Sequence, residues 1–204
     1  MNEQLNRQIN LLSGFILMGF PVVLLIDDLL PEKASPTQFI VSLCAAWFFI
    51  AGIFALARLA WIYRPRTVII AGMIGLAGIF GSVSIMVFRF VVGTIRQTDG
   101  AIGNAAQFNS AVGKISPFIF MPGLLPPLVL IFLSAIMLKH EKTAKWAWAF
   151  VCAGALLFPA GRIFLGQPVI LLSDALLLLS LGYLGWRILS VKSNKQLILE
   201  TNAA

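Results

Sequence analysis

Six long apolar stretches occupy most of this 204-residue chain. They cover residues 9–26, 38–63, 67–93, 117–138, 145–165 and 168–189. Each is close to or above the about 20 residues that an α-helix needs to cross a hydrocarbon core about 30 Å thick. Only 11% of the residues are charged, against about 25% in a typical soluble domain. The sequence therefore predicts an all-α polytopic membrane protein, with six transmembrane helices in a single domain over residues 1–204.

The basic residues indicate how these helices are oriented. Most of them fall at the two ends of the chain and in the second and fourth connections: Arg7, Arg64, Arg66, Lys139, Lys142, Lys145, Arg187, Lys192 and Lys195. Lys33, Arg96 and Lys114 fall on the other side. The positive-inside rule then places both termini in the cytoplasm. The net charge of +7 thus mainly reflects the basic residues that set the orientation of the helices in the membrane. We expect membrane lipids as partners and no nucleic acid.

The connection between the third and fourth stretches, residues 94–116, is much longer than the others and is expected on the outer side. It is rich in Gly, Asn, Gln and Ser, and its apolar residues recur at roughly helical spacing. Two interpretations stay open: a short helix lying on the outer interface, and a mobile loop that would serve as the lid of a pocket, since long loops are functional more often than short ones. Asn104 and Gln107 are its candidate binding residues.

The third stretch carries small residues at regular intervals. Gly72, Gly75, Gly78 and Gly81 recur at every third position. Small residues let helix backbones approach closely in lipid, where packing and hydrogen bonds drive association. The pattern predicts that the third helix lies at the centre of the bundle.

Charged residues inside the apolar stretches are the main functional signal. Each costs about 2.5–3.5 kcal/mol to insert and marks a functional site when a partner or cavity can be named for it. Arg58 lies near the cytoplasmic end of the second stretch, where snorkelling explains it. Arg89, Arg162 and Asp174 share the outer third of the membrane on this topology. Asp27 and Asp28 follow the first stretch at the same face and complete the set of candidate ligand-binding residues.

The prolines inside the stretches fall in that same outer half: Pro21, Pro122, Pro126, Pro127 and Pro159. Each removes a backbone donor and frees a carbonyl group. At membrane depth such a group needs a protein partner or a wet cavity. The helix breaks and the charges therefore point to one region.

Two interpretations of this region compete. In the first, Arg162 and Asp174 form a fixed ion pair that ties the fifth helix to the sixth, and Arg89 snorkels to the outer headgroups. In the second, Arg89, Arg162 and Asp174 line an outward-facing polar pocket among the third, fourth, fifth and sixth helices, together with carbonyl groups freed around Pro122, Pro126 and Pro159. Two arginines against one carboxylate would then suit an anionic or zwitterionic guest.

Several kinds of chemistry are excluded by composition. The single histidine, His140, lies in a cytoplasmic turn, so neither a membrane Ser/His dyad nor a histidine-based metal or haem site can be assembled. The two cysteines form no CxxC motif, and no phosphate-binding glycine loop occurs in a strand-to-helix context. We expect no cofactor, no metal and no assigned catalytic residue.

The segment from Leu130 to Ile163 has a recognisable order: an aliphatic helix, a short basic turn, a Trp, and a helix ending in Phe158-Pro159-Ala160-Gly161-Arg162. Together with Phe88-Arg89-Phe90 before the long connection, it resembles six-helix bacterial membrane proteins grouped as domains of unknown function. The resemblance covers about half the chain. It implies a multi-pass protein of the bacterial inner membrane and no particular reaction.

Three functions follow as hypotheses. The first is a membrane protein that binds or transports a polar, anionic or amphiphilic small molecule, including a lipid, from the outer side. Because six helices are few for a transporter, we expect that such a protein could form a homodimer. The second is a non-catalytic accessory subunit of a membrane complex, with a membrane-protein partner. The third, and least expected, is an enzyme that modifies lipids through an aspartate such as Asp174.

Overall fold

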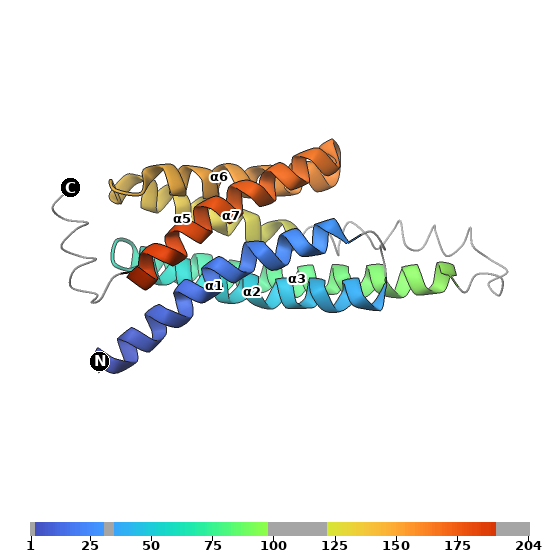
Figure 1. Cartoon of the computed structure of the whole chain (residues 1–204), viewed down its shortest axis with the longest axis horizontal. Helices are drawn as coiled ribbons and strands as arrows, with labels where there is room; N and C mark the ends of the chain where they lie inside the picture. The colour runs from blue at the N-terminus through green and yellow to red at the C-terminus, as the bar shows by residue number, and fades with distance from the viewer. Residues whose placement is uncertain (1–2, 31–34, 98–121, 191–204) are drawn as a thin grey trace.

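A computed structural model describes residues 3–30, 35–97 and 122–190, and this part of the chain is helical without strands (Figure 1). Six helices are long and apolar enough to cross a membrane, which is the architecture of a multi-pass membrane protein and confirms the predicted helical class. The segments are α1 (Glu3–Leu29), α2 (Pro36–Trp61), α3 (Pro65–Gln97), η1 (Pro122–Leu124), α5 (Leu125–His140), α6 (Lys145–Ala160), η2 (Gly161–Leu165) and α7 (Gln167–Ser190).

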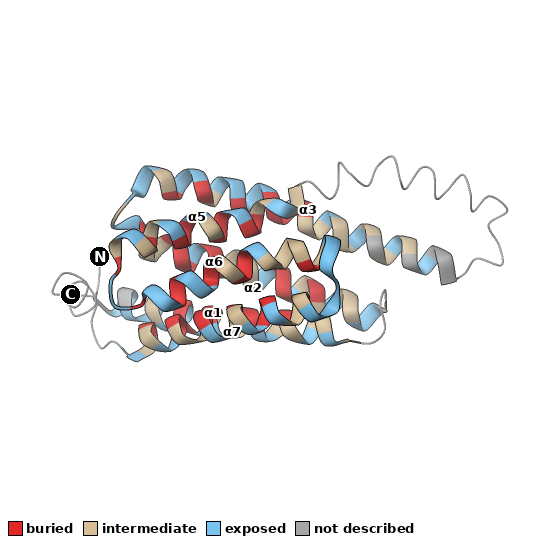
Figure 2. Ribbon diagram, turned by 90° about the horizontal axis from the view of Figure 1, so that it is seen from above, coloured by how far each residue is buried: buried red, intermediate tan, exposed pale blue. Residues whose placement is uncertain are grey.

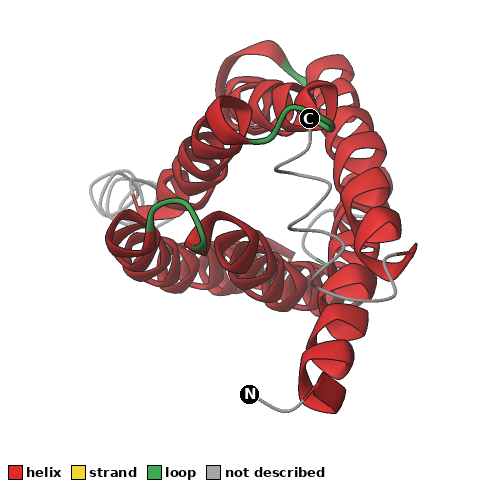
Figure 3. Cartoon of the chain, turned by 90° about the vertical axis from the view of Figure 1, so that its left-hand side faces the viewer, coloured by secondary structure: helices red, strands yellow, loops and turns green. Residues whose placement is uncertain are grey.

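The six long helices form a closed ring, seen end-on in Figure 3. Along the ring α1 packs against α2, α2 against α3, α3 against α5, α5 against α6 and α6 against α7, and α7 returns to α1. α1 begins and α7 ends at the same end of the bundle (Figure 1). The short connections between α2 and α3, between α5 and α6 and between η2 and α7 join helices that are neighbours in the ring, as is usual for short connections.

The ring closes where α1 crosses α7 through two glycines. A Cβ atom added to Gly185 would lie 2.6 Å from the carbonyl oxygen of Gly14, and one added to Gly14 would lie 2.9 Å from the carbonyl oxygen of Gly185. No side chain fits between backbones at this distance. The pair therefore allows the first and last helices of the chain to touch directly.

The glycines of α3 serve a different contact from the predicted one. A Cβ atom on Gly78 would lie 2.5 Å from the ring of Pro126, and one on Gly81 would lie 2.3 Å from Pro122. Gly72 faces open space within 4 Å. The stripe thus brings α3 against η1 and the start of α5. The prediction of a central third helix is wrong, because α3 is one member of the ring with α2 and α5 as its neighbours.

The buried residues lie along the helices where neighbours in the ring meet, and exposed residues cover the rest of the helix surfaces (Figure 2). Trp148, Leu56, Leu133 and Leu181 are fully buried where helices meet. Large apolar side chains such as Phe80, 75% exposed, cover much of the outside. Lipid tails solvate such a surface without cost, so the exposed apolar residues need no further partner.

A polar cluster links helices at the end of the ring where α1 begins and α7 ends. Arg187 of α7 pairs with Glu141, which follows α5 and is 6% exposed. Trp148 of α6 donates from Nε1 to Glu141 Oε2 at 2.6 Å, and Arg187 Nη2 donates to the Thr143 hydroxyl at 2.7 Å. Glu141 thereby joins three consecutive helices.

We expect Arg187→Met to lower the stability of the protein by about 1–3 kcal/mol, because it leaves the buried Glu141 carboxylate with fewer donors. The measurement is thermal unfolding in detergent, followed by loss of helical signal. Lys139→Met is the matched control, since it removes a cation from an exposed site on α5. Equal melting temperatures for the two variants would contradict a stabilising role for the cluster.

Candidate functional site

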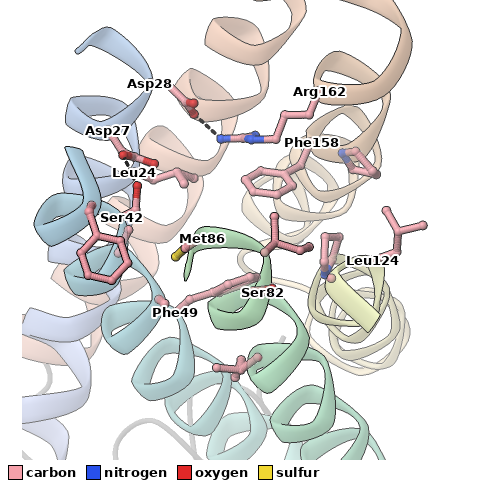
Figure 4. Close-up of a pocket in the computed structure, with 18 of the residues that line it drawn as sticks. Leu24, Asp27, Asp28, Ser42, Phe49, Ser82, Met86, Leu124, Phe158 and Arg162 are labelled. Atoms are coloured by element: carbon pink, nitrogen blue, oxygen red, sulfur yellow. Dashed lines mark hydrogen bonds and ion pairs between the residues drawn. The ribbon is translucent and has the colours of Figure 1, made fainter. Parts of the chain in front are cut away.

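A cavity of about 610 Å³ opens in the half of the ring opposite to the start of α1 and the end of α7 (Figure 4). Five helices and both short segments enclose it: the end of α1, the first half of α2, the second half of α3, η1 with α5, and the end of α6 with η2. No lining residue belongs to α7. The cavity thus shares α3, α5 and α6 with the pocket expected among the third to sixth helices, but α1 and α2 complete it in place of α7.

The lining divides into an apolar body and a polar end. Aromatic and aliphatic side chains form the body: Phe20, Leu24, Phe39, Phe49, Ile79, Ile85, Met86, Phe90, Leu124, Phe158 and Ile163. Asp27, Asp28 and Arg162 gather on one side, with Ser42 close by, whereas Phe49 and Met86 lie below them (Figure 4). Ser82 lies deeper, and its hydroxyl donates to the Gly78 carbonyl. The site therefore offers charge at one end and hydrocarbon contact along the rest.

A break in the α6 helix places Arg162 at this polar end. Pro159 cannot donate to the carbonyl group of Ala155, the bond that a regular helix would make. The next turn, Gly161–Leu165, is a π-helix, in which the Gly166 amide donates to the Gly161 carbonyl at 2.9 Å across five residues. Gly166 then adopts φ 77°, a left-handed conformation that glycine tolerates. Single π turns of this kind recur at functional sites.

Arg162 forms its ion pair with Asp28 of α1, through Nη2 and Oδ2. Both side chains are largely buried, at 22% and 12% exposure. The guanidinium also lies 3.7 Å from the centroid of the Phe158 ring, a cation–π contact. Gln167 Nε2 donates to the Asp28 carbonyl at 3.0 Å. The fixed Arg162–Asp174 pair predicted as one interpretation is therefore replaced by a pair between α1 and η2.

Asp174 lies behind this pair and does not line the cavity. Its side chain is fully buried, and none of the described residues donates a hydrogen bond to either of its carboxylate oxygens. It interacts electrostatically with Asp28, Arg162 and Asp27. Nη1 of Arg162 is also buried without a hydrogen-bond acceptor among the described residues. Four of the predicted site residues are thus brought together at one place.

Asp27 is positioned by α2. The hydroxyl of Ser42 donates to Asp27 Oδ1 at 2.5 Å, and Ser42 itself is buried. Both aspartates stand near the C-terminal end of α1, where the helix dipole disfavours negative charge. Ser42 and Arg162 supply donors that offset part of this cost.

The remaining predicted residues are only partly located. Arg89 lies in α3 directly before Phe90, which lines the cavity, but its side chain is outside the described part. Asn104 and Gln107 lie outside the described residues altogether. Ser42 and the aromatic residues of α2 were missed by the sequence analysis, because nothing in an apolar helix marks which face meets a cavity.

Comparison with protein-family models, with curated proteins and with solved structures finds no match to this chain. The resemblance to six-helix bacterial membrane proteins therefore stays a prediction.

A double-mutant cycle distinguishes the two candidate partners of Arg162. We expect Arg162→Met and Asp28→Asn to couple by about 0.5–3 kcal/mol in unfolding stability, because residues in direct contact are non-additive. The stability of single and double variants is measured by thermal unfolding in one detergent. The same cycle with Asp174→Asn is the control, and a stronger coupling there would contradict the Arg162–Asp28 pair.

Proposed function

We propose that this protein binds a lipid-like amphiphile whose polar headgroup lies at Asp27, Asp28 and Arg162 and whose hydrocarbon chain fills the apolar body of the cavity. The observation that carries the proposal is the division of one cavity into a charged end and a long apolar lining. Its volume of about 610 Å³ falls within the range of about 300–1,000 Å³ that is typical of small-molecule sites.

The charges favour a headgroup with both signs. Arg162 has five N–H donors in total, and its Nη1 is buried without an acceptor among the described residues, so it has capacity for a phosphate or carboxylate. The carboxylates of Asp27 and Asp28 accept further hydrogen bonds beside their present ones. A zwitterionic headgroup with a phosphodiester and a primary ammonium complements this arrangement.

The headgroup rather than the chain would provide selectivity. A chain that leaves a bilayer for the cavity exchanges one apolar environment for another, so hydrophobic transfer contributes little. Charge-assisted hydrogen bonds, by contrast, strengthen when they move away from water. We therefore expect binding to depend mainly on contacts at the polar end.

The positive-inside distribution of basic residues supports an orientation with both termini in the cytoplasm. In that orientation the cavity lies in the outer half of the membrane. The protein would then receive its amphiphile from the outer leaflet, as a binding protein or as one step of transport.

Headgroup preference is the first test. We expect lysophosphatidylethanolamine to bind more tightly than lysophosphatidylcholine of the same chain, since the quaternary ammonium has no N–H to donate to the aspartates, and more tightly than lysophosphatidylglycerol, which lacks the cation. Native mass spectrometry of the detergent-solubilised protein measures bound lipid against concentration. Equal occupancy by all three lipids would show that the polar end does not select a headgroup.

Filling the cavity is the second test. Ala45 of α2 is buried and lines the cavity, so Ala45→Phe should reduce lysophosphatidylethanolamine occupancy by occupying the space of its chain. Cys44→Phe is the matched control, since Cys44 is adjacent but exposed. If both variants retain full occupancy while folded, the chain lies elsewhere and the proposed site is wrong.

A further inference from the structure

Asp174 combines three properties that the proposed binding site does not use. It is fully buried in α7, both of its carboxylate oxygens lack a donor among the described residues, and its carboxyl group is close enough to the Asp28 carboxyl group for the two to interact directly. Two ionised carboxylates are both acceptors, so this contact becomes a hydrogen bond only when one of them carries a proton. An ionised, unpaired carboxylate at this depth would be strongly disfavoured.

We infer that Asp174 is a proton-binding site that controls whether Arg162 is free to hold the ligand. This inference rests on the proposed function and concerns its regulation. With the proton bound, Asp174 donates to Asp28, Asp28 keeps its ion pair with Arg162, and Nη1 of Arg162 remains available to the anionic group of a ligand. Without the proton, the Asp174 carboxylate becomes an acceptor for Nη1 and competes with that group.

The charged groups that face Asp174 are compatible with this exchange. α1 presents Asp27 and Asp28, and η2 presents Arg162. α6 presents no charged side chain at this level, since its one charged residue, Lys145, begins the helix at the opposite end. Among the side chains that the structure describes, Arg162 is thus the one cation found to interact with Asp174 and Asp28. Its buried Nη1 has no other acceptor among the described residues.

The exchange also has a structural route. Arg162 lies on the π turn Gly161–Leu165 that leads into α7 through Gly166, so the same short segment connects it to the helix that carries Asp174. If the guanidinium moved from Asp28 to Asp174, the ion pair between α1 and η2 would break. An ion pair between η2 and α7 would replace it. Proton binding and ligand binding would then stabilise the same arrangement.

The proton is tested first on the ligand-free protein, so that the result does not depend on the proposed ligand. Infrared spectroscopy at about pH 7 should show the C=O stretching band of a protonated carboxyl group. The band should shift when all aspartates carry a ¹³C carboxyl label, disappear in Asp174→Asn and remain in Asp27→Asn. Absence of the band in the unsubstituted protein, or a band that does not respond to labelling, would overturn the inference even if Asp174→Asn fails to fold.

The linkage is tested with lysophosphatidylethanolamine between about pH 5 and pH 9, where its ammonium and phosphodiester both stay predominantly charged. Affinity of the unsubstituted protein should fall by about tenfold as the pH rises and Asp174 loses its proton. Asp174→Asn, which stays neutral and can still donate to Asp28, should keep the low-pH affinity throughout. The same pH dependence in both proteins would overturn the linkage. A correct infrared result without any lysophosphatidylethanolamine binding would refute the proposed function and leave the proton site intact.

Discussion

The direct contact between α1 and α7 is the constraint on which the rest of this structure depends. Gly14 and Gly185 let the two backbones touch, and this contact turns a row of helices into a closed ring. Closure brings Asp28 beside the η2 segment that precedes α7, so that an arginine far along the sequence finds its carboxylate. Without that closure the apolar cavity would be open to lipid along its length. A contact between small residues thus allows the bundle to hold charged side chains together in a low-dielectric environment.

The two ends of the ring use charge in different ways. At the end where the chain starts and finishes, Glu141 is surrounded by donors from Trp148 and Arg187, and its negative charge is compensated. At the other end the carboxylates of Asp27, Asp28 and Asp174 meet Arg162, and Asp174 has no donor among the residues that the structure describes. A fully satisfied cluster rigidifies a bundle, whereas a partly satisfied one retains the capacity to bind a proton or a ligand. This contrast is the reason for placing function at the second cluster.

Sequence reasoning located the helices and the charged region but not the pairings within it. The apolar stretches predict the spans because bilayer thickness sets helix length, and the coincidence of Pro159, Arg162 and Asp28 marks the correct end of the bundle. The partner of Arg162 depends on which helices are neighbours, and the spacing of residues along one helix carries no such information. The glycines of α3 show the same limit: they predict a close approach, but not that η1 and α5 would be the elements approached. Ser42 and the aromatic residues of α2 that line the cavity have no sequence feature that distinguishes them from other membrane-helix residues. Only the arrangement of the helices shows that they face the cavity.

The closure of the ring by its first and last helices also sets an order of events during biosynthesis. α1 leaves the ribosome first and α7 last, since N-terminal segments are made and begin to fold first. Asp27 can meet Ser42 as soon as α2 is inserted, but Asp28 must wait for η2 before it meets Arg162. Until then the Asp28 carboxylate lacks the cation that η2 supplies in the folded protein. The ring therefore keeps an open seam between α1 and α6 until α7 is inserted between them.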